Sequence, residues 1–400
     1  MADEITRRPF KVFIVVGEES GDQLGARLMH ALKGIHGESV TFEGVGGERM
    51  AREGLHSTFA LSDIAVMGLT AVLQTLPTII RRVHETVDAA VAAKPDVLVI
   101  IDSPDFTHNV AKRVRKRAPE IPIVDYVSPS VWAWRPGRAR KMARYVDHLL
   151  AILPFEPDVH RRLGGPPTTY VGHPLIERLD DLRPAPGERP GLTETGRPTL
   201  LILPGSRRSE VSRLLEPFGR ALEIIHSERP TIDVILPAVP HLEGEIREQT
   251  ANWRVPVDMV VGEEAKFRAF RRAHAALAAS GTVSLELAIA AVPMAVAYKL
   301  DWFYRRIKDL NRIIKFAGVD SMVLPNIILG KNVVPEFLDD DASPDALAKK
   351  ILELLEEGEA RSRQLLEFES LEDRMRLADN LSQSGEAARI VTELAQCGRS

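Results

Sequence analysis

Residues 10–22 read FKVFIVVGEESGD, and this stretch decides how the chain begins to fold. Its first seven residues form a short, β-branched apolar run, which predicts a buried strand, and two glycines bound the turn that follows. The next residues, up to Lys33, place apolar side chains at helical spacing. A strand, a tight turn and a helix in this order are typical of a Rossmann-like α/β sheet.

The same alternation of short apolar runs and helical patterns continues along the chain. Further strands are predicted at 97–101, 121–127, 148–153, 199–203, 232–236, 257–261, 273–279 and 294–298. A proline- and glycine-rich stretch, residues 172–197, interrupts the pattern and predicts a linker. We therefore predict two Rossmann-like domains, residues 9–178 and 197–370, that face each other across a cleft.

Composition sets limits on the class of protein. The chain has 400 residues, which suffices for two domains, and a net charge of only -4, which gives no reason to expect a nucleic-acid partner. Its single cysteine, Cys397, excludes an intrachain disulfide and a cysteine-based zinc site and fits a reducing cytoplasm. Because no apolar run approaches the ~20 residues of a spanning helix, we expect neither a membrane span nor a cleaved signal.

Acidic residues follow the first predicted strands of the chain. Asp102 stands at the end of strand 97–101, where a carboxylate can act as general base toward a hydroxyl group or, alternatively, cap a helix. The turn that contains Glu18 and Ser20 opens a helix, so its amides can hold an anion or a sugar hydroxyl. Its two acids would repel a pyrophosphate, and a purely structural turn is equally compatible with the spacing.

An aromatic segment lies beside basic residues in the first half. Residues 126–135 read YVSPSVWAWR. Trp132 and Trp134 suit a sugar ring or an acyl chain, although two large aromatics also suit a core. Arg135 and the following Arg138 can pair with a phosphate. We interpret the segment as part of a ligand site.

Other segments favour anionic or membrane surfaces. Basic residues gather at 112–117 and 135–144, as either solvated helix faces or contacts to phosphates and head groups. Residues 64–80 carry an apolar stripe at helical spacing, which suits a core or a membrane surface. The aromatic and basic segment 302–315 suits a membrane interface.

The second half contains two turns suited to a nucleotide diphosphate. Ser206 and Arg207 follow a predicted strand and precede a helix, so glycine-permitted approach and arginine charge coincide there. The turn Ser280-Gly281-Thr282 is similar, and Glu286, one helical turn later, can accept both ribose hydroxyls. No metal-binding motif is visible, so we expect neither a metal nor another cofactor, and arginines and helix N-termini would stabilise a departing diphosphate.

Ten short strings along the chain now form a pattern. They are GEESGD (17–22), AVMGL (65–69), IDSPDF (101–106), YVSPSVWAW (126–134), LPFE (153–156), VGHP (171–174), LPGSR (203–207), ASGT (279–282), Glu286 and LPN (324–326). In this order the set resembles the lipid-A-disaccharide synthase family, and the tryptophan-containing string is the most specific of them. Glu19 and Arg208 depart from the family pattern, which more often has a small or hydroxyl residue and a glycine there.

The resemblance implies a glycosyltransferase of the GT-B type, in which C-terminal helices, here residues 371–398, return to the first domain. It implies an inverting reaction between UDP-2,3-diacylglucosamine and 2,3-diacylglucosamine 1-phosphate (lipid X), which yields the β-1,6-linked lipid A disaccharide 1-phosphate and UDP. Asp102 would serve as catalytic base and Asn326 would line the donor pocket. The protein would attach peripherally to the cytoplasmic side of the inner membrane. The sequence leaves the oligomeric state open, a homodimer included.

Two other functions fit parts of the same pattern. A UDP-N-acetylglucosamine 2-epimerase would share the architecture but need no acyl-chain site. A non-catalytic nucleotide-sugar-binding protein at the membrane surface would keep the binding turns without needing Asp102.

Overall fold

The computed structural model divides into two compact units, which are described separately. Unit 1 comprises the chain up to His173 and again from Leu377 onward, and unit 2 comprises Pro174–Arg376. The structure describes residues 9–64, 69–299, 321–378 and 381–397. The predicted membrane segment 302–315 therefore lies outside the described residues.

Unit 1 is built on a parallel sheet. Its strands are β1 (Phe10–Val16), β2 (Val40–Val45), β3 (His56–Ser57), β4 (Val97–Ile101), β5 (Ile123–Tyr126), β6 (His148–Ala151) and β7 (Thr168–Tyr170). In the described residues they follow the order β3-β2-β1-β4-β5-β6-β7. The order reverses between β1 and β4, where Val16 pairs with Ile101, so the turns after these two strands meet at the topological switch point of the sheet.

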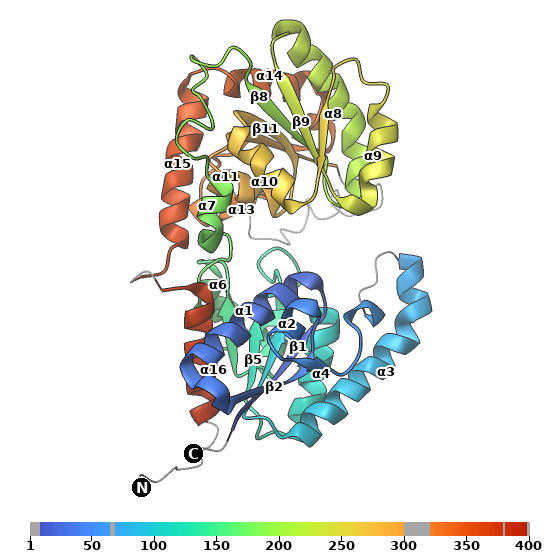
Figure 1. The fold of residues 1–400 in the computed structure, drawn as a ribbon, viewed down its shortest axis with the longest axis vertical. Coiled ribbons are helices and arrows are strands. Elements are labelled where there is room, and N and C mark those ends of the chain that lie inside the picture. Colours follow the sequence, from blue (N-terminus) through green and yellow to red (C-terminus); the bar gives the residue numbers. More distant parts are fainter. Residues whose placement is uncertain (1–8, 65–68, 300–320, 379–380, 398–400) are drawn as a thin grey trace. The chain divides into compact units, whose positions relative to one another are not determined.

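Helices cover both faces of this sheet. They are α1 (Glu19–His36), α2 (Glu48–Arg52), α3 (Leu69–Ala93), α4 (Pro104–Arg117), α5 (Gly137–Met142), α6 (Glu156–Leu163) and α16 (Gln383–Cys397), with short 3-10 turns η1 (Gly37–Ser39) and η2 (Leu61–Asp63). On one face α16 lies beside α1 (Figure 1), and both pack on Val12 and Ile14. On the other face α3 and α4 pack on Phe13 and Val15. The alternation of buried side chains along β1 thus serves two cores.

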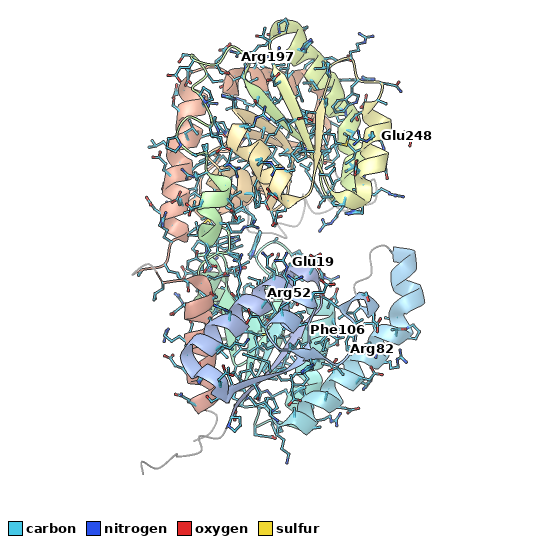
Figure 2. The ribbon with its side chains drawn as sticks, in the orientation of Figure 1. Glu19, Arg52, Arg82, Phe106, Arg197 and Glu248 are labelled. Atoms are coloured by element: carbon cyan, nitrogen blue, oxygen red, sulfur yellow. The ribbon has the colours of Figure 1, made fainter. Side chains whose placement is uncertain are left out.

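An aromatic contact fixes the start of α4 against α3. Phe106, in the first turn of α4, meets Phe59 edge-on with ring centroids 6.3 Å apart. The guanidinium of Arg82 lies 4.7 Å from the centroid of the same Phe59 ring and pairs with Asp63. Figure 2 labels Phe106 and Arg82, on α4 and α3. Because Phe106 is buried, this contact anchors the segment that immediately follows Asp102.

Unit 2 repeats the arrangement with a second parallel sheet. Its strands are β8 (Thr199–Leu203), β9 (Asp233–Ala238), β10 (Asp258–Val261), β11 (Ala275–Ala279), β12 (Met294–Tyr298) and β13 (Glu336–Leu338). In the described residues their order is β10-β9-β8-β11-β12-β13. The reversal falls between β8 and β11, where Leu203 pairs with Ala278.

The helices of unit 2 pack around this sheet (Figure 1). They are α7 (Leu179–Leu182), α8 (Arg208–Glu228), α9 (Glu243–Thr250), α10 (Glu263–Arg272), α11 (Val283–Ile289), α13 (Leu324–Leu329), α14 (Pro344–Leu354) and α15 (Glu359–Met375), with turns η3 (Ile176–Arg178), η4 (Pro240–Leu242) and η5 (Asp339–Asp341). Helices α8 and α14 lie against each other and share a core with β8 and β11. The predicted α/β fold of two Rossmann-like halves is confirmed.

The stretch predicted as a linker packs on unit 2. Arg189 donates hydrogen bonds to four backbone carbonyls, at 2.7 to 3.1 Å. These carbonyls belong to Phe270, Arg271, Ala290 and Ala291. Arg183 donates to the carbonyl of Ile289 and pairs with Glu372. From Pro174 onward the stretch is therefore an attached part of unit 2, because arginine side chains bind it there.

The apolar stripe predicted at 64–80 begins differently in the structure. Ile64 follows η2 and is buried in the core of unit 1, and the described part of α3 spans Leu69–Ala93. Within the described side chains of α3, Leu76 and Ile80 are exposed. None of the described helices is long and apolar enough to cross a membrane.

Candidate functional site

Asp102 stands at the switch point of the first sheet with both carboxylate oxygens engaged. The Ser103 backbone N–H donates to Oδ1 at 2.7 Å, and the Ser20 hydroxyl donates to Oδ2 at 3.1 Å. The side chain is only half-buried, so water or a substrate can still reach it. Two donors hold the carboxylate in one orientation while its remaining lone pairs stay available.

The backbone at Asp102 adopts an unusual conformation. Asp102 has φ 51° and Ser103 has φ 46°, so two successive residues with side chains occupy the left-handed region. The Asp102 N–H donates to the Tyr126 carbonyl at 3.1 Å, and the Thr107 hydroxyl donates to the Asp102 carbonyl at 2.6 Å. Strain that surrounding contacts enforce in this way is concentrated at functional sites.

Gly17 lets the first turn approach Asp102. A Cβ at this position would lie 2.3 Å from the Ser103 Oγ, which no side chain tolerates. The close approach brings the Glu18 carboxylate to 3.4 Å from the Ser103 hydroxyl and Ser20 to Asp102. The predicted residues Glu18, Ser20 and Asp102 are therefore brought together at one end of the sheet.

The last residue of the first motif has a structural role. Asp22 is buried, and its carboxylate accepts the backbone N–H groups of Gly47, Arg49 and Met50 at 2.7 to 3.1 Å. It thereby caps the start of α2. The acidic residues of this motif thus have two roles: Glu18 lies near Asp102 at the end of the sheet, and Asp22 holds the start of α2.

The two tryptophans of the aromatic segment differ in exposure. Trp132 is half-buried and meets Phe155 edge-on, with ring centroids 5.4 Å apart. Trp134 is 53% exposed, and the guanidinium of Arg135 lies 4.3 Å from its ring centroid. Trp132 therefore contributes to packing, while Trp134 and Arg135 present an aromatic and cationic surface to solvent.

A polar cluster is buried under this segment. Ser128 and the His160 Nε2 lie 2.8 Å apart, and burial lowers the pKa of His160 to about 4. Burial also raises the pKa of Glu156 to about 8, although the Leu153 N–H donates to its carboxyl at 3.1 Å. At neutral pH the histidine is uncharged and Glu156 is largely protonated, so the segment rests on neutral hydrogen-bonding groups.

Unit 2 contains a cavity of about 470 Å³ at the carboxyl ends of β8, β9, β10 and β11. It lies at the switch point of the second sheet, where α/β proteins of this kind bind ligands. The volume is in the range of small-molecule sites. Among its lining residues are Ser206, Arg207, Ser280, Gly281, Thr282 and Glu286. Six predicted residues from turns about 75 positions apart are thus brought together.

Lys266 is a lining residue that the sequence did not reveal. Its Nζ lies 3.0 and 2.8 Å from the two Glu286 carboxylate oxygens. Both side chains are mostly buried. Lys266 comes from α10 and lies in no recognisable motif, so only the packing of α10 against β8, β9 and β10 could place it here. Lys266 and Glu286 therefore place one positive and one negative group in the wall of the cavity.

Glu210 stabilises the turn that contains Ser206 and Arg207. Its Oε2 accepts the backbone N–H groups of Ser206 and Arg207 at 3.1 and 3.3 Å. The Arg207 guanidinium lies 3.3 Å from the other Glu210 oxygen and is 80% exposed. Arg208, where the family pattern has glycine, pairs with Glu245 at 2.9 Å. The charge of Arg207 faces the cavity, while that of Arg208 is directed to α9.

Asn326 has a different environment from the other predicted residues. It is buried, and its Oδ1 accepts the N–H groups of Val333 and Val334 at 2.9 and 2.8 Å. Its amide nitrogen donates to the Val334 carbonyl at 2.8 Å and to Glu336 at 3.0 Å. The side chain holds the loop before β13 and does not line the cavity, because its amide is used within the protein.

The described residues contain no group of three or more His, Cys, Asp or Glu side chains that could hold a metal ion. Positive charge at the cavity comes instead from Arg207 and Lys266.

Two doubly wound units, each with polar residues gathered at its switch point, form the architecture of the GT-B type. A family model described as lipid-A-disaccharide synthetase matches residues 12–391. The chain belongs to this family, and it is a glycosyltransferase.

Named relatives agree with this assignment. The chain is 52% identical to the lipid-A-disaccharide synthase of Nitrobacter winogradskyi and 50% identical to that of Bradyrhizobium diazoefficiens. The alignments cover 98% of both chains in the first case and 97% in the second.

Solved structures agree with the fold. The UDP-GlcNAc 2-epimerase of Neisseria meningitidis superposes with a TM-score of 0.60 at 14% identity over 97% of this chain and 100% of the other. MurG of Acinetobacter baumannii gives a TM-score of 0.53 at 13% identity over 96% and 100%. At such low identity the likeness shows the architecture alone. The epimerase hypothesis is therefore not favoured over the family to which the chain belongs.

Proposed function

We propose that the protein condenses UDP-2,3-diacylglucosamine with 2,3-diacylglucosamine 1-phosphate to give the β-1,6-linked lipid A disaccharide 1-phosphate and UDP. The observation that carries this proposal is the strained, doubly anchored carboxylate of Asp102 in a chain whose relatives are named lipid-A-disaccharide synthase. A protein that only binds nucleotide sugars has no need of such a group.

In this proposal unit 2 holds the donor. The cavity offers Arg207 and Lys266 to the diphosphate and Glu286 to the ribose hydroxyls, with Ser206 and the turn at 280–282 beside them. Lys266 keeps the Glu286 carboxylate oriented, as the contacts of 2.8 and 3.0 Å support. Fixed cations next to a departing diphosphate stabilise the charge that develops in the transition state.

Unit 1 activates the acceptor in the same proposal. Asp102 accepts the proton of the acceptor 6-hydroxyl as its oxygen attacks the donor anomeric carbon. The bond from that carbon to the UDP oxygen breaks, and the configuration inverts. Glu18 and Ser20 border the carboxylate, while Trp134 and Arg135 offer a surface to the sugar and its substituents.

The decisive experiment combines an assay with a substitution. Purified protein is mixed with both acylated substrates, without added metal, and the disaccharide is sought by mass spectrometry. Asp102→Ala is expected to lower turnover by ~10²-fold or more, as the loss of a general base does, while UDP binding measured by calorimetry is retained. Glu120→Gln, which removes an exposed acid of the same unit, serves as the matched control.

Two results would contradict the proposal. Unchanged turnover of Asp102→Ala would remove this residue from the mechanism. A wild-type protein that binds UDP but forms no disaccharide from the two acylated substrates would favour the non-catalytic binding protein.

We also propose that the protein attaches peripherally to the cytoplasmic side of the inner membrane, where both substrates reside. The exposed Leu76 and Ile80, one helical turn apart on α3, support an apolar contact. That the protein forms a homodimer stays a prediction, because no feature of the described residues tests it.

A further inference from the structure

We propose that Lys112, Arg138 and Lys141, on α4 and α5 of unit 1, form the binding site for the phosphomonoester of the acceptor. This inference rests on the proposed function and deepens it, because that function assigns residues to the donor diphosphate but none to the acceptor phosphate. Two observations support it: these cations have few anionic partners in the described residues, and they lie close to the loop that carries Asp102.

All three arginines of the basic run 112–117 are already used by the protein. Arg113 donates to a backbone carbonyl at 3.0 Å, and Arg115 and Arg117 each pair with an aspartate. Their partners are Asn109, Asp147 and Asp88, in that order. These side chains stabilise α4 and its surroundings, so they are not available to a ligand without loss of a protein contact.

Three cations nearby lack this compensation. In the part of the chain that the structure describes, no carboxylate lies within ion-pair distance of Lys112 or Lys141. Arg138 has one, Asp105, at 3.5 Å, and that carboxylate is 97% exposed. A pair of this length with so exposed a partner contributes little. In the described residues the positive charge of these three side chains is therefore opposed mainly by one exposed carboxylate, that of Asp105.

The three charges lie close enough to disfavour one another. The Lys112 ammonium lies 5.2 Å from the ring centroid of Tyr145, which is buried beneath it. Burial lowers the pKa of Lys112, and the charges of Arg138, Lys141 and Arg113 lower it further, while the nearby Asp105 carboxylate acts in the opposite direction to a smaller extent. A bound anion would relieve this repulsion, so the cluster favours anionic ligands.

The position of the cluster matches the acceptor. Helix α4 begins two residues after Asp102, and Asp105 in its first turn contacts Arg138. The guanidinium of Arg138 also lies 5.9 Å from the centroid of the exposed Trp134 ring. In the acceptor a single sugar ring separates the 6-hydroxyl from the 1-phosphate. When the acceptor 6-hydroxyl lies at Asp102, its 1-phosphate therefore lies within reach of the cations next to the same loop.

A phosphomonoester is the anion that this cluster suits best. It carries a charge of about -1.5 to -2 at neutral pH and three acceptor oxygens. Arginine binds such a group with a planar pair of donors, and lysine adds a mobile point charge. One arginine and two lysines can thus neutralise the acceptor phosphate.

The experiment pairs protein variants with two acceptors, 2,3-diacylglucosamine 1-phosphate and the same lipid without its phosphate. For wild-type protein the phosphate is expected to lower the acceptor KM. Arg138→Gln and Lys112→Met are each expected to raise the KM of the phosphorylated acceptor about tenfold or more, the effect of losing one charge-assisted hydrogen bond. The KM of the unphosphorylated acceptor and of the donor should change less than about twofold.

Lys116→Met is the matched control, because it removes the same charge from the exposed surface of the same helix. Lys141→Met provides a second, exposed test position should Arg138→Gln fail to fold. Sedimentation with phosphatidylglycerol vesicles separates the two sources of phosphate. If the cluster variants and Lys116→Met lose vesicle binding alike and the KM ratio of the two acceptors stays at the wild-type value, the cluster contacts bulk lipid and the inference is wrong.

Direct binding keeps this inference distinct from the proposed function. Equilibrium binding of the phosphorylated acceptor in detergent is measured for wild-type protein and Arg138→Gln. Weaker binding by the variant supports the site even if no disaccharide forms, in which case the proposed reaction alone fails. Equal binding overturns the site even if the reaction proceeds.

Discussion

Glu156 is a carboxylic acid that the fold keeps away from water. It begins α6 directly under the aromatic segment, and burial raises its pKa to about 8 from an ordinary value of 4.5. In its neighbour His160 burial acts in the opposite sense and lowers the pKa to about 4. Both shifts favour the neutral form, because desolvation penalises charge.

The shift of Glu156 makes stability depend on pH. Between pH 6.5 and 8 the folded state retains a proton that the unfolded state has released, so the free energy of unfolding falls as pH rises through this window, by up to about 1.4 kcal/mol per pH unit. Glu156→Gln removes this titration. We expect the stability of the variant relative to wild type to increase from pH 6.5 to pH 8.

Urea denaturation at the two pH values measures this difference. Burial lowers the pKa values of His160 and His173, so these histidines change the free energy of unfolding only below pH 6.5. They are present in both proteins, so their contribution cancels in the difference between variant and wild type. A constant difference between variant and wild type across the window would show that Glu156 is ionised in the folded state.

At the scale of elements, the first turn of α8 joins helix stability to ligand binding. The Glu210 carboxylate occupies the N–H groups of Ser206 and Arg207. It thus holds the turn in shape before any ligand arrives, and it also places a negative charge beside the proposed diphosphate site.

These two effects can be separated by substitution. Glu210→Ala is expected to lower the free energy of unfolding by about 1 kcal/mol, as the loss of a cap does, and to weaken UDP binding because the turn loosens. Glu210→Gln keeps an acceptor oxygen but removes the charge, so it should bind UDP at least as tightly as wild type. Calorimetric titration with UDP decides, and an alanine variant with wild-type affinity would show that the cap does not shape the site.

Which strands could be predicted depended on how they are buried. The bounds of β1, β4, β8 and β12 were predicted correctly, because parallel strands that are buried along nearly their whole length appear as almost continuous apolar runs. The strand β2 was missed, since its buried residues alternate with exposed ones and Gly44 interrupts it. The strand β13 has only three residues, all partly buried, so no pattern marks it.

The residues of the candidate site also fall into those that the sequence could predict and those that it could not. Turns at strand ends carry a local signal, and the structure brings those around Asp102 and those around Arg207 to their respective switch points. Lys266 and Lys112 lie within helices and acquire their surroundings only when α10 and α4 pack. Asn326 was expected in the donor pocket on resemblance alone, and its buried amide bonds could not be foreseen.

At the scale of the whole molecule, the two units differ in how the chain completes them. The core of unit 2 uses residues from Leu200 to Leu355 and none from unit 1. The core of unit 1 includes Ala387, Val391 and other buried residues of α16, which packs on α1. Unit 2 is therefore self-contained in sequence, and unit 1 is not.

Fragments test this asymmetry. Residues 174–376 expressed alone are expected to unfold cooperatively and to bind UDP within about tenfold of the affinity of the full chain, because every described residue that lines the cavity belongs to unit 2. A chain ending at Arg376 should retain UDP binding but expose apolar surface of unit 1, since α16 is missing. Thermal unfolding followed by circular dichroism, together with dye binding, measures both. An isolated fragment that is unfolded would contradict the independence of unit 2.

The return of α16 to unit 1 also sets an order of events on the ribosome. The segment that is synthesised first must wait, with one side of its sheet covered by α1 but not yet by α16, until the roughly two hundred residues of unit 2 have emerged and the last helix arrives. The middle of the chain needs no such delay. Unit 2 can therefore complete its fold before unit 1, and we expect the first part of the chain to be the part that chaperones bind.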